Sequence, residues 1–409
     1  MTDLRRRALD LDAADPLAGC RDLFLPGTDL QAYFDGNSLG RPLVAAVERL
    51  DAFVREQWAG RLIRGWTEGW LDWPVEVGDQ LGRAALGAGP GQVVVADATT
   101  VLLYKLARAA VALRRRDDDR RDEVVVGRDD FPTDRYVAEG VAAEHGMTLR
   151  WVETDPAAGV TPELVAEAVG PRTALVLLSG VAYRSAWVAD MAAVTQAVHD
   201  AGAVVLWDLS HAVGAVELEL DAWGVDLAVG CTYKFLGGGP GAPAFAYVRR
   251  DLLPGLRQPV QGWIGRRDPF LMAQGYEPAA DVRRVLSGTP PVLAMVPLRA
   301  FLDVLEEVGM PAVRAKSRAL TAYALDLVDA WLPGVELVSP RDPDRRGGHV
   351  TLRRAGFRDL LGPLWAEGVL PDFREPDDLR LGLAPLSTSF VEVHDGVRRL
   401  ADLAGAPSR

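Results

Sequence analysis

The sequence predicts an α/β fold with a mostly parallel central sheet flanked by helices, followed by a smaller α+β region. Three observations predict it: short apolar runs within residues 93–248, helical periods between most of them, and a different pattern after residue 290. Most of the runs are continuously apolar rather than alternating, which is typical of strands buried on both faces of a sheet. Strands that alternate with helices favour parallel pairing, because each helix carries the chain back across the sheet.

The expected elements of the central sheet follow in order along the chain. We expect strands at Val93–Asp97, Glu123–Val126, Thr148–Val152, Ala174–Ser179, Val204–Asp208, Leu227–Thr232 and Ala244–Val248. Helical periods occupy Pro162–Val169 and Asp190–Ala201, and Gly202 is a plausible C-cap of the second. Ligands of such sheets bind at the carboxyl ends of the strands, so residues just after these strands are candidates for a site.

The remainder has a different organisation. Helices are predicted at Val292–Val308, Ala312–Trp331, Leu360–Glu367 and Val391–Leu403, with strands at Gly348–Arg353 and Leu379–Gly382. We therefore expect an N-terminal segment, 1–60, that joins a small C-terminal domain, 291–409, and a large domain, 61–290, between them.

Composition limits the classes of partner. The 409 residues are 49% hydrophobic and 25% charged, which is ordinary for a globular protein, and the formal net charge is −12. This acidity argues against nucleic acid or an anionic membrane as a partner. Two cysteines far apart, Cys20 and Cys231, fit a reducing cytoplasm, and the N-terminus shows no signal peptide. We expect a cytoplasmic protein that binds no metal.

One lysine stands where a lysine performs chemistry. The chain has three, and Lys105 and Lys316 lie in helical runs, whereas Lys234 follows a strand and opens a glycine cluster. Asp208 and His211 stand at the end of an earlier strand. An acid at a strand end, a nearby His and a Lys before a Gly-rich turn are typical of a pyridoxal phosphate (PLP) site. There the lysine forms the Schiff base, and the acid keeps the pyridine nitrogen protonated.

Other strand ends supply candidates for the rest of this cofactor. Thr99 and Thr100 open a helix after the first strand, where backbone N–H groups and hydroxyls can hold a phosphate. A plain threonine N-cap is the alternative. Phe131 follows a strand and can stack on the pyridine ring or belong to the core. Asp208 can likewise be a helix cap; the order of the features favours the cofactor.

Several segments together resemble the kynureninase family, whose members are PLP enzymes of fold type I, the aspartate aminotransferase-like fold. They are Tyr33–Gly40, Leu62–Trp66 with Gly69 and Trp70, Phe131–Tyr136, Trp207–Gly214, Trp223–Asp226, Tyr233–Lys234, Gly262–Trp263, Gly288–Pro291 and Arg380–Leu386. The resemblance runs from Tyr33 to about Val397, nearly the whole chain.

The resemblance implies roles for individual residues. Lys234 holds the cofactor and later moves the Cα proton, Asp208 pairs with the pyridinium nitrogen, and Tyr233 is a candidate acid/base. The implied cofactor-binding set is Thr99, Thr100, Phe131, Asp134, Ser179, Asp208, His211, Tyr233, Lys234, Trp263 and Thr289. The implied substrate-binding set is Ser38, Trp66 and Arg380, with Arg380 clamping the α-carboxylate. A homodimer is implied too, with Gly262–Arg266 as a candidate for crossing between subunits.

The implied reaction is hydrolysis of the Cβ–Cγ bond of kynurenine, or of a 3-hydroxy or otherwise substituted kynurenine, to an anthranilate and alanine. Ala182, Arg266 and Ser387 depart from the family pattern, which often has Asn, His and Tyr there, and this concerns the substrate more than the cofactor. Two alternatives remain. One is another fold type I reaction on an amino acid, such as β-elimination or desulfuration, and the other is a non-catalytic protein with this fold.

Overall fold

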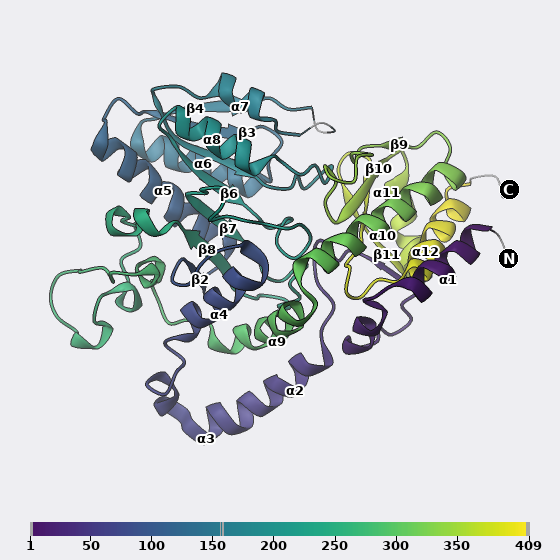
Figure 1. Cartoon of the computed structure of the whole chain (residues 1–409), viewed down its shortest axis with the longest axis horizontal. Coiled ribbons are helices and arrows are strands. Elements are labelled where there is room, and N and C mark those ends of the chain that lie inside the picture. The colour runs from purple at the N-terminus through teal and green to yellow at the C-terminus, as the bar shows by residue number, and fades with distance from the viewer. Residues whose placement is uncertain (1–2, 156, 158, 406–409) are drawn as a thin grey trace.

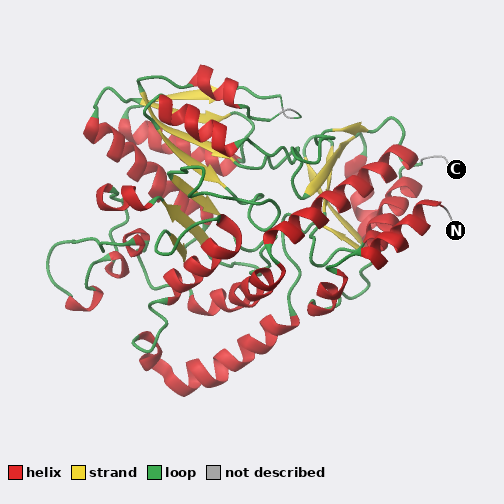
Figure 2. Cartoon of the chain, in the orientation of Figure 1, coloured by secondary structure: helices red, strands yellow, loops and turns green. Residues whose placement is uncertain are grey.

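The chain forms two sheets with helices packed on and between them, as the computed structural model in Figures 1 and 2 shows; it describes residues 3–155, 157 and 159–405. A seven-stranded sheet has the order β2-β8-β7-β6-β5-β3-β4, and a five-stranded sheet has the order β1-β11-β12-β10-β9. The long helix α10 (Met310–Trp331) runs from the first sheet region toward the second (Figure 1).

The larger sheet is mostly parallel, as predicted. Its strands are β2 (Val93–Ala96), β3 (Glu123–Gly127), β4 (Thr148–Val152), β5 (Thr173–Ser179), β6 (Val204–Asp208), β7 (Leu227–Gly230) and β8 (Ala244–Val248). All neighbours pair in parallel except β8, which is antiparallel to β7 and to β2. No helix lies between β7 and β8, so the glycine-rich turn returns the chain alongside β7 in the opposite direction.

Successive strand residues divide between two apolar layers, one on each face of this sheet. Val94, Val124 and Leu206 belong to the layer that includes α5 (Thr99–Asp117) and α6 (Pro132–His145). The opposite layer includes α7 (Pro162–Ala168), α8 (Met191–Asp200) and α9 (Val292–Val308). Because both faces are covered, strands buried throughout require continuous apolar runs. Only the edge strand β4 departs from this pattern, being half-buried along most of its length.

The smaller sheet combines both ends of the chain. It contains β1 (Ala32–Phe34), β9 (Glu336–Leu337), β10 (His349–Arg353), β11 (Val369–Arg374) and β12 (Asp378–Gly382). β1 pairs in parallel with β11, and α1 (Asp3–Ala14) packs on α12 (Phe390–Leu403). The helix α11 (Phe357–Ala366) packs on β11. The expected strands β10 and β12 are present, whereas β1, β9 and β11 were not predicted. The first and last helices, α1 and α12, lie on the same side of the molecule (Figure 1).

Two irregular segments pack partly against these layers. One contains α2 (Val44–Ala52), a π-helical stretch (Phe53–Trp58), α3 (Ala59–Arg61), a 3₁₀ turn (Leu62–Trp66), α4 (Trp73–Leu81) and a π-helical turn (Gly82–Leu86). The other carries only 3₁₀ turns, at Arg250–Gly255, Trp263–Gly265, Pro269–Leu271 and Val282–Val285, and it extends outward in Figure 1. A further 3₁₀ turn spans Ala18–Leu23. Among the helices described, none is both long and apolar enough to cross a bilayer.

Candidate active site

A cavity of about 240 Å³ opens at the carboxyl ends of β5 and β6. Its lining consists of Ala98, Thr99, Thr100, Phe131, Thr133, Asp134, Ser179, Val181, Tyr183, Asp208, Ser210, His211, Tyr233 and Lys234. All of the cofactor-binding residues implied by the sequence are in this set except Trp263 and Thr289. The position agrees with the rule that such sheets bind ligands where their strands end.

Lys234 is the lysine at this cavity. Its Nζ lies 2.9 Å from Nε2 of His211, and the His211 side chain is buried. The other two lysines form ion pairs elsewhere. Lys105 Nζ donates to Asp97 at 2.6 Å and to the Val285 carbonyl at 3.1 Å, and Lys316 Nζ lies 2.5 Å from Asp15. Lys234 is thus the one lysine whose amine reaches a ligand-sized space.

Buried acids line the inner wall of the cavity. Asp208 ends β6 and accepts the Ser210 N–H at 2.8 Å, while Asp134 in the first turn of α6 accepts the Ser179 hydroxyl at 3.4 Å. Burial, the Asp208 carboxylate and Asp130 raise the pKa of Asp134 well above its usual value. Burial also raises the pKa of Asp130, to about 6. A protonated ring nitrogen would fit this acid-rich wall, because a cationic N–H offsets the repulsion between the carboxylates.

The start of α5 provides an anion-binding end. Its N-cap is Ala98, whose side chain accepts no hydrogen bond, so within the described residues no side chain caps the first turn. Thr99 and Thr100 carry hydroxyls at the same place, and all three residues line the cavity. Free N–H groups with adjacent hydroxyls are what a phosphate group requires. These residues therefore fit PLP at both its phosphate end and its ring nitrogen.

Aromatic side chains enclose the space between these ends. The Phe131 ring meets Tyr183 edge-on at a centroid distance of 5.4 Å, and Lys234 Nζ lies 6.0 Å from the ring centroids of Phe131 and of Tyr233. Burial raises the pKa of the Tyr233 phenol above its ordinary value, so Tyr233 carries its proton at neutral pH. Burial of the His211 ring lowers its pKa well below its usual value, and the positive charge of Lys234 lowers it further. His211 is therefore neutral.

Arg380 lies behind this cavity. It is fully buried on β12, and its Nη1 donates to the Tyr183 carbonyl at 2.6 Å. Its Nη2 donates to the Ser38 hydroxyl at 3.2 Å, and its Nε to Asp372 at 2.7 Å. Ser38 and Arg380 are thus in contact with each other and reach the cavity wall through Tyr183.

Besides Ser38 and Arg380, three residues implied by the sequence do not line this cavity. Trp66 packs edge-on against Trp70 at 5.4 Å, Trp263 is 39% exposed beside Phe270 at 5.9 Å, and Thr289 is exposed. The three residues that depart from the family pattern also lie apart from one another. The Ala182 N–H donates to the Trp187 carbonyl, Arg266 donates to the Asp268 carbonyl at 2.9 Å, and Ser387 is buried in a separate crevice.

Some lining residues were missed by the sequence reasoning. Tyr183, Val181 and Ser210 line the cavity although no role was assigned to them. Val181 and Tyr183 follow β5, and Ser210 lies between Asp208 and His211, so their nearness to strand ends was the available signal.

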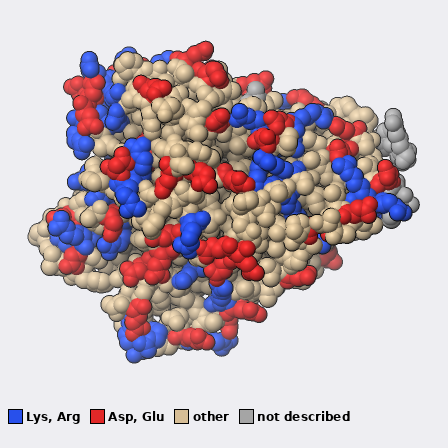
Figure 3. All heavy atoms as spheres, viewed as in Figure 1, with Lys and Arg blue, Asp and Glu red and all other residues tan. Residues whose placement is uncertain are grey.

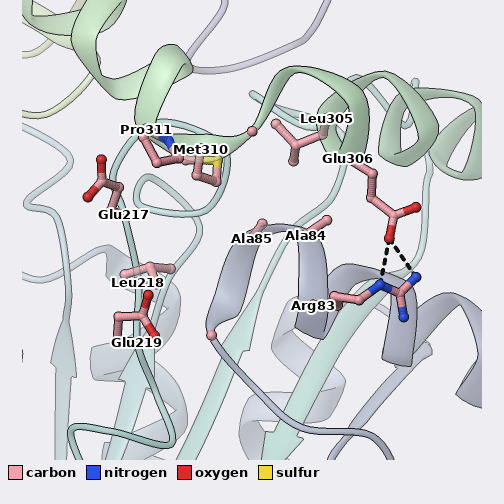
Figure 4. A pocket seen from close by; sticks show the side chains of 12 residues that line it. Arg83, Ala84, Ala85, Glu217, Leu218, Glu219, Leu305, Glu306, Met310 and Pro311 are labelled. Carbon is pink, nitrogen blue, oxygen red and sulfur yellow. Dashed lines mark hydrogen bonds and ion pairs between the residues drawn. The ribbon is translucent and has the colours of Figure 1, made fainter.

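A larger cavity, of about 390 Å³, lies elsewhere, between the end of α9 and the segment 83–87 (Figure 4). Arg83 pairs there with Glu306, and Glu217 and Glu219 face it without a lysine in the lining. Acidic and basic side chains are interspersed over the face of the molecule in Figure 3. The described residues contain no group of three or more His, Cys, Asp or Glu arranged to hold a metal ion.

Comparisons with known proteins agree with this geometry. The profile of the family described as aminotransferase class-V matches residues 84–359. A kynureninase from Pseudomonas fluorescens is 39% identical over 405 residues, covering 98% of this chain and 95% of that protein. One from Burkholderia pseudomallei is 40% identical over the same shares.

Solved structures share the fold at low identity. The structure of a cysteine desulfurase from Thermococcus onnurineus has a TM-score of 0.80 at 17% identity, covering 91% of this chain and 94% of that one. A cysteine desulfurase from Escherichia coli has a TM-score of 0.79 at 18% identity, covering 95% and 97%. At this identity the likeness concerns the fold alone.

Proposed function

The chain belongs to the kynureninases, within the aminotransferase class-V family, and we propose that its Lys234 cavity is where it hydrolyses the Cβ–Cγ bond of L-kynurenine or of a ring-substituted kynurenine. The cofactor is pyridoxal phosphate, and the products are an anthranilate and L-alanine. The single observation that carries the assignment of the site is Lys234 at the cavity, with its Nζ on His211, while both other lysines are held in ion pairs.

Bound PLP supplies an electron sink for the charge that develops at Cα of the substrate. The residues of the chain provide the rest. Lys234 would anchor the cofactor and then carry the Cα proton, and Asp208 would keep the ring nitrogen protonated. Thr99 and Thr100, at the start of α5, would hold the phosphate, and Phe131 would pack against the ring.

Tyr233 is the group we assign to proton transfer during hydration of the side-chain ketone. It lines the cavity next to Lys234, and burial keeps its phenol protonated at neutral pH. A protonated phenol donates to a carbonyl oxygen and so favours the attack of water on that carbonyl.

Arg380 and Ser38 form the proposed end for the substrate carboxylate. The guanidinium presents fixed N–H donors, and Asp372 holds it in orientation by accepting from both Nε and Nη2. Since Tyr183 occupies Nη1 through its carbonyl, we expect the 181–184 segment to adjust when a substrate carboxylate binds.

We propose further that two copies of the chain complete the site. Trp263 and Thr289 are exposed rather than at the cavity, and Trp66 lies apart from it. Apolar side chains near the first of these are also exposed: Phe270 by 53%, Leu271 by 60% and Met272 by 73%. Burying such residues favours association, and a homodimer would place Trp263 and Thr289 against the other copy's cavity.

Free cysteines argue against desulfuration and fit a reducing cytoplasm. Cys231 is buried, with its Sγ 3.7 Å from the Ser210 carbonyl, and Cys20 lies near the Lys316–Asp15 pair; neither lines the cavity. Burial raises the pKa of both thiols, which disfavours the reactive thiolate. We propose a cytoplasmic enzyme on the same ground.

The test is a product assay. PLP-loaded protein is incubated separately with kynurenine, 3-hydroxykynurenine and cysteine, and anthranilates, alanine and sulfide are measured. We expect an anthranilate and alanine in equal amounts from at least one kynurenine, and none with Lys234→Ala. Sulfide release without anthranilate would overturn the proposal, and equal rates with both kynurenines would show that the ring substituent is not recognised.

A further inference from the structure

A second buried histidine lies behind His211. His349 is fully buried on β10, and its ring centroid lies 5.7 Å from that of His211 at an interplanar angle of 59°. Neither ring nitrogen of His349 has a partner that meets hydrogen-bond distance and angle, although the Arg184 backbone lies close enough to raise the pKa of the ring, and Nδ1 of His211 has no partner either. Buried polar atoms in native proteins are almost always paired, with protein or with ordered water, so unpaired nitrogens in adjacent rings point to a bound water.

The unpaired atoms continue across the face of the small sheet. His349 is opposite Gly382 in the β10–β12 pairing, and Asn37 fills the space where a side chain at Gly382 would clash with it. Both polar atoms of the Asn37 amide are buried without a partner, as is Oδ1 of Asp35. Asp35 bridges to Gly382 as well. These groups converge on one glycine, so they form a single polar cluster rather than scattered defects. A water bound there would find the two to four polar partners that a buried water requires.

The contact with Lys234 determines which ring nitrogen of His211 carries the proton. Both histidines are neutral, because burial lowers their pKa values, with Lys234, Arg380 and Arg374 adding charge repulsion around both rings. A neutral ring carries one N–H and one lone pair. When Lys234 donates to Nε2 of His211 at 2.9 Å, the proton of His211 must be on Nδ1. That N–H then points away from Lys234 and needs an acceptor.

We propose that His349 is a positioning residue: through an ordered water bound to both rings, it accepts from Nδ1–H of His211 and fixes the tautomer whose Nε2 accepts from Lys234. The inference rests on the proposed role of Lys234 in the reaction. No direct hydrogen bond joins the rings, and their unpaired nitrogens are the polar partners that a bridging water would bind. A side chain at position 382 would displace Asn37, so the glycine preserves the cluster.

The test reads the tautomer directly, without cofactor or turnover. Histidine side chains are labelled with ¹⁵N, and long-range ¹H–¹⁵N spectra of the PLP-free chain are recorded from about pH 6 to 8, the range in which an ordinary histidine titrates. We expect His211 to stay neutral with its proton on Nδ1. Finding the proton on Nε2, or a charged ring, in the unsubstituted chain would overturn the proposal without any variant.

Variants separate positioning from structure. In His349→Phe we expect His211 to show mixed tautomers and kcat of the holoenzyme to fall about tenfold, with KM changed less than about twofold, because the lost contact acts on the reacting lysine rather than on substrate binding. His349→Gln keeps an acceptor and should restore the His211 signal and most of kcat.

A matched control is His394, another buried histidine, whose Nδ1 lies 2.7 Å from Asp395 and whose ring packs on Trp331. His394→Gln should leave the His211 signal and kcat unchanged. A fall in kcat in His349→Phe with the His211 tautomer intact would overturn the proposal. If that variant does not fold, the spectrum of His349→Gln decides by the same criterion. Loss of anthranilate formation in the unsubstituted enzyme would contradict the proposed function instead, and would leave the tautomer result to stand by itself.

Discussion

The two sides of the Lys234 cavity differ in how complete they are. On the side of the seven-stranded sheet, Lys234, Asp208 and His211 meet within one chain, and the start of α5 lies at the same cavity. On the other side, Arg380 is held by Asp372 and covered by Tyr183, while Trp66 lies elsewhere. Two residues implied for the cofactor, Trp263 and Thr289, do not line the cavity either. The single chain thus brings most of the implied cofactor-binding residues together, but it separates Trp66 from Ser38 and Arg380.

The difference follows from topology. The carboxyl ends of neighbouring parallel strands lie at the same edge of the sheet. Residues that directly follow these strands are therefore close together without further packing between domains. The substrate half draws on loops and on the separate small sheet, whose relative positions depend on packing and, we propose, on a second copy. Substitutions on the side of the seven-stranded sheet should therefore abolish catalysis, whereas each substitution on the substrate side should weaken substrate binding by a limited amount.

The largest effect is expected at Lys234. Lys234→Ala should abolish turnover and leave PLP bound only non-covalently, because no other lysine amine reaches the cavity. Borohydride reduction of the unsubstituted holoprotein, followed by peptide mass spectrometry, should place the label on Lys234. A label on Lys105 or Lys316 would show that the cavity described here is not the cofactor site.

Lys105→Met is the matched control for this variant. It should keep the label on Lys234 but leave Asp97 without its ion-pair partner. The free energy of unfolding should fall by about 3 kcal/mol, the lower end of the range for breaking a buried pair, because Asp97 is partly exposed.

The next effect is expected at Asp208. Asp208→Asn should lower kcat by about a hundredfold or more while PLP occupancy changes little, because an amide cannot hold the ring nitrogen protonated. Absorbance titration measures occupancy, and the anthranilate assay measures the rate. Near-normal turnover would mean that Asp134 or another group performs this task.

On the substrate side, Arg380→Lys should lower kcat/KM by about ten- to a hundredfold, since a charge-assisted hydrogen bond contributes roughly 1.5–3 kcal/mol and lysine offers no bidentate fork. PLP affinity should stay the same. Asp372→Asn, which loosens the guanidinium without removing it, should give a smaller loss in the same direction. Unchanged kcat/KM in Arg380→Lys would place the carboxylate elsewhere, with Arg184 the nearest alternative on the 181–184 segment.

Much of the fold could be predicted because burial on both faces leaves a strong local signal. The strands at 93–97, 204–208 and 244–248 are continuous or nearly continuous apolar runs, and the structure has them within a residue. β1 was missed because Ala32–Phe34 has three residues and gains its partner from the opposite end of the chain, and β11 because Pro371 and Asp372 interrupt the apolar pattern of Val369–Arg374. Pairing over such a sequence distance leaves no local pattern.

The candidate site divides in the same way. Residues at strand ends, such as Asp208, Ser179 and Lys234, were predicted and lie together. Tyr183 was missed because its place depends on the turn after β5, and His349 because a lone buried histidine in a strand has no distinguishing sequence pattern. The roles of Trp66, Trp263 and Thr289 remain predictions, since a single chain does not bring them to the cavity.

The smallest effect tests whether a second copy completes the site. Trp263→Phe keeps the ring and removes the indole N–H, so PLP should bind about five- to tenfold more weakly, as is typical of losing one hydrogen bond of about 1 kcal/mol or slightly more. The loss should arise in the neighbouring cavity rather than in the chain's own. A mixed dimer combines one Lys234→Ala chain, which keeps Trp263, with one Trp263→Phe chain, which keeps Lys234. If Trp263 serves the neighbouring cavity, the Lys234 cavity of the second chain receives the intact Trp263 of the first. That cavity should bind PLP with unsubstituted affinity, measured by absorbance titration. Weakened binding in the mixed dimer, or a fully active monomer by light scattering, would mean that Trp263 serves its own chain and that both halves of the site are assembled within one copy.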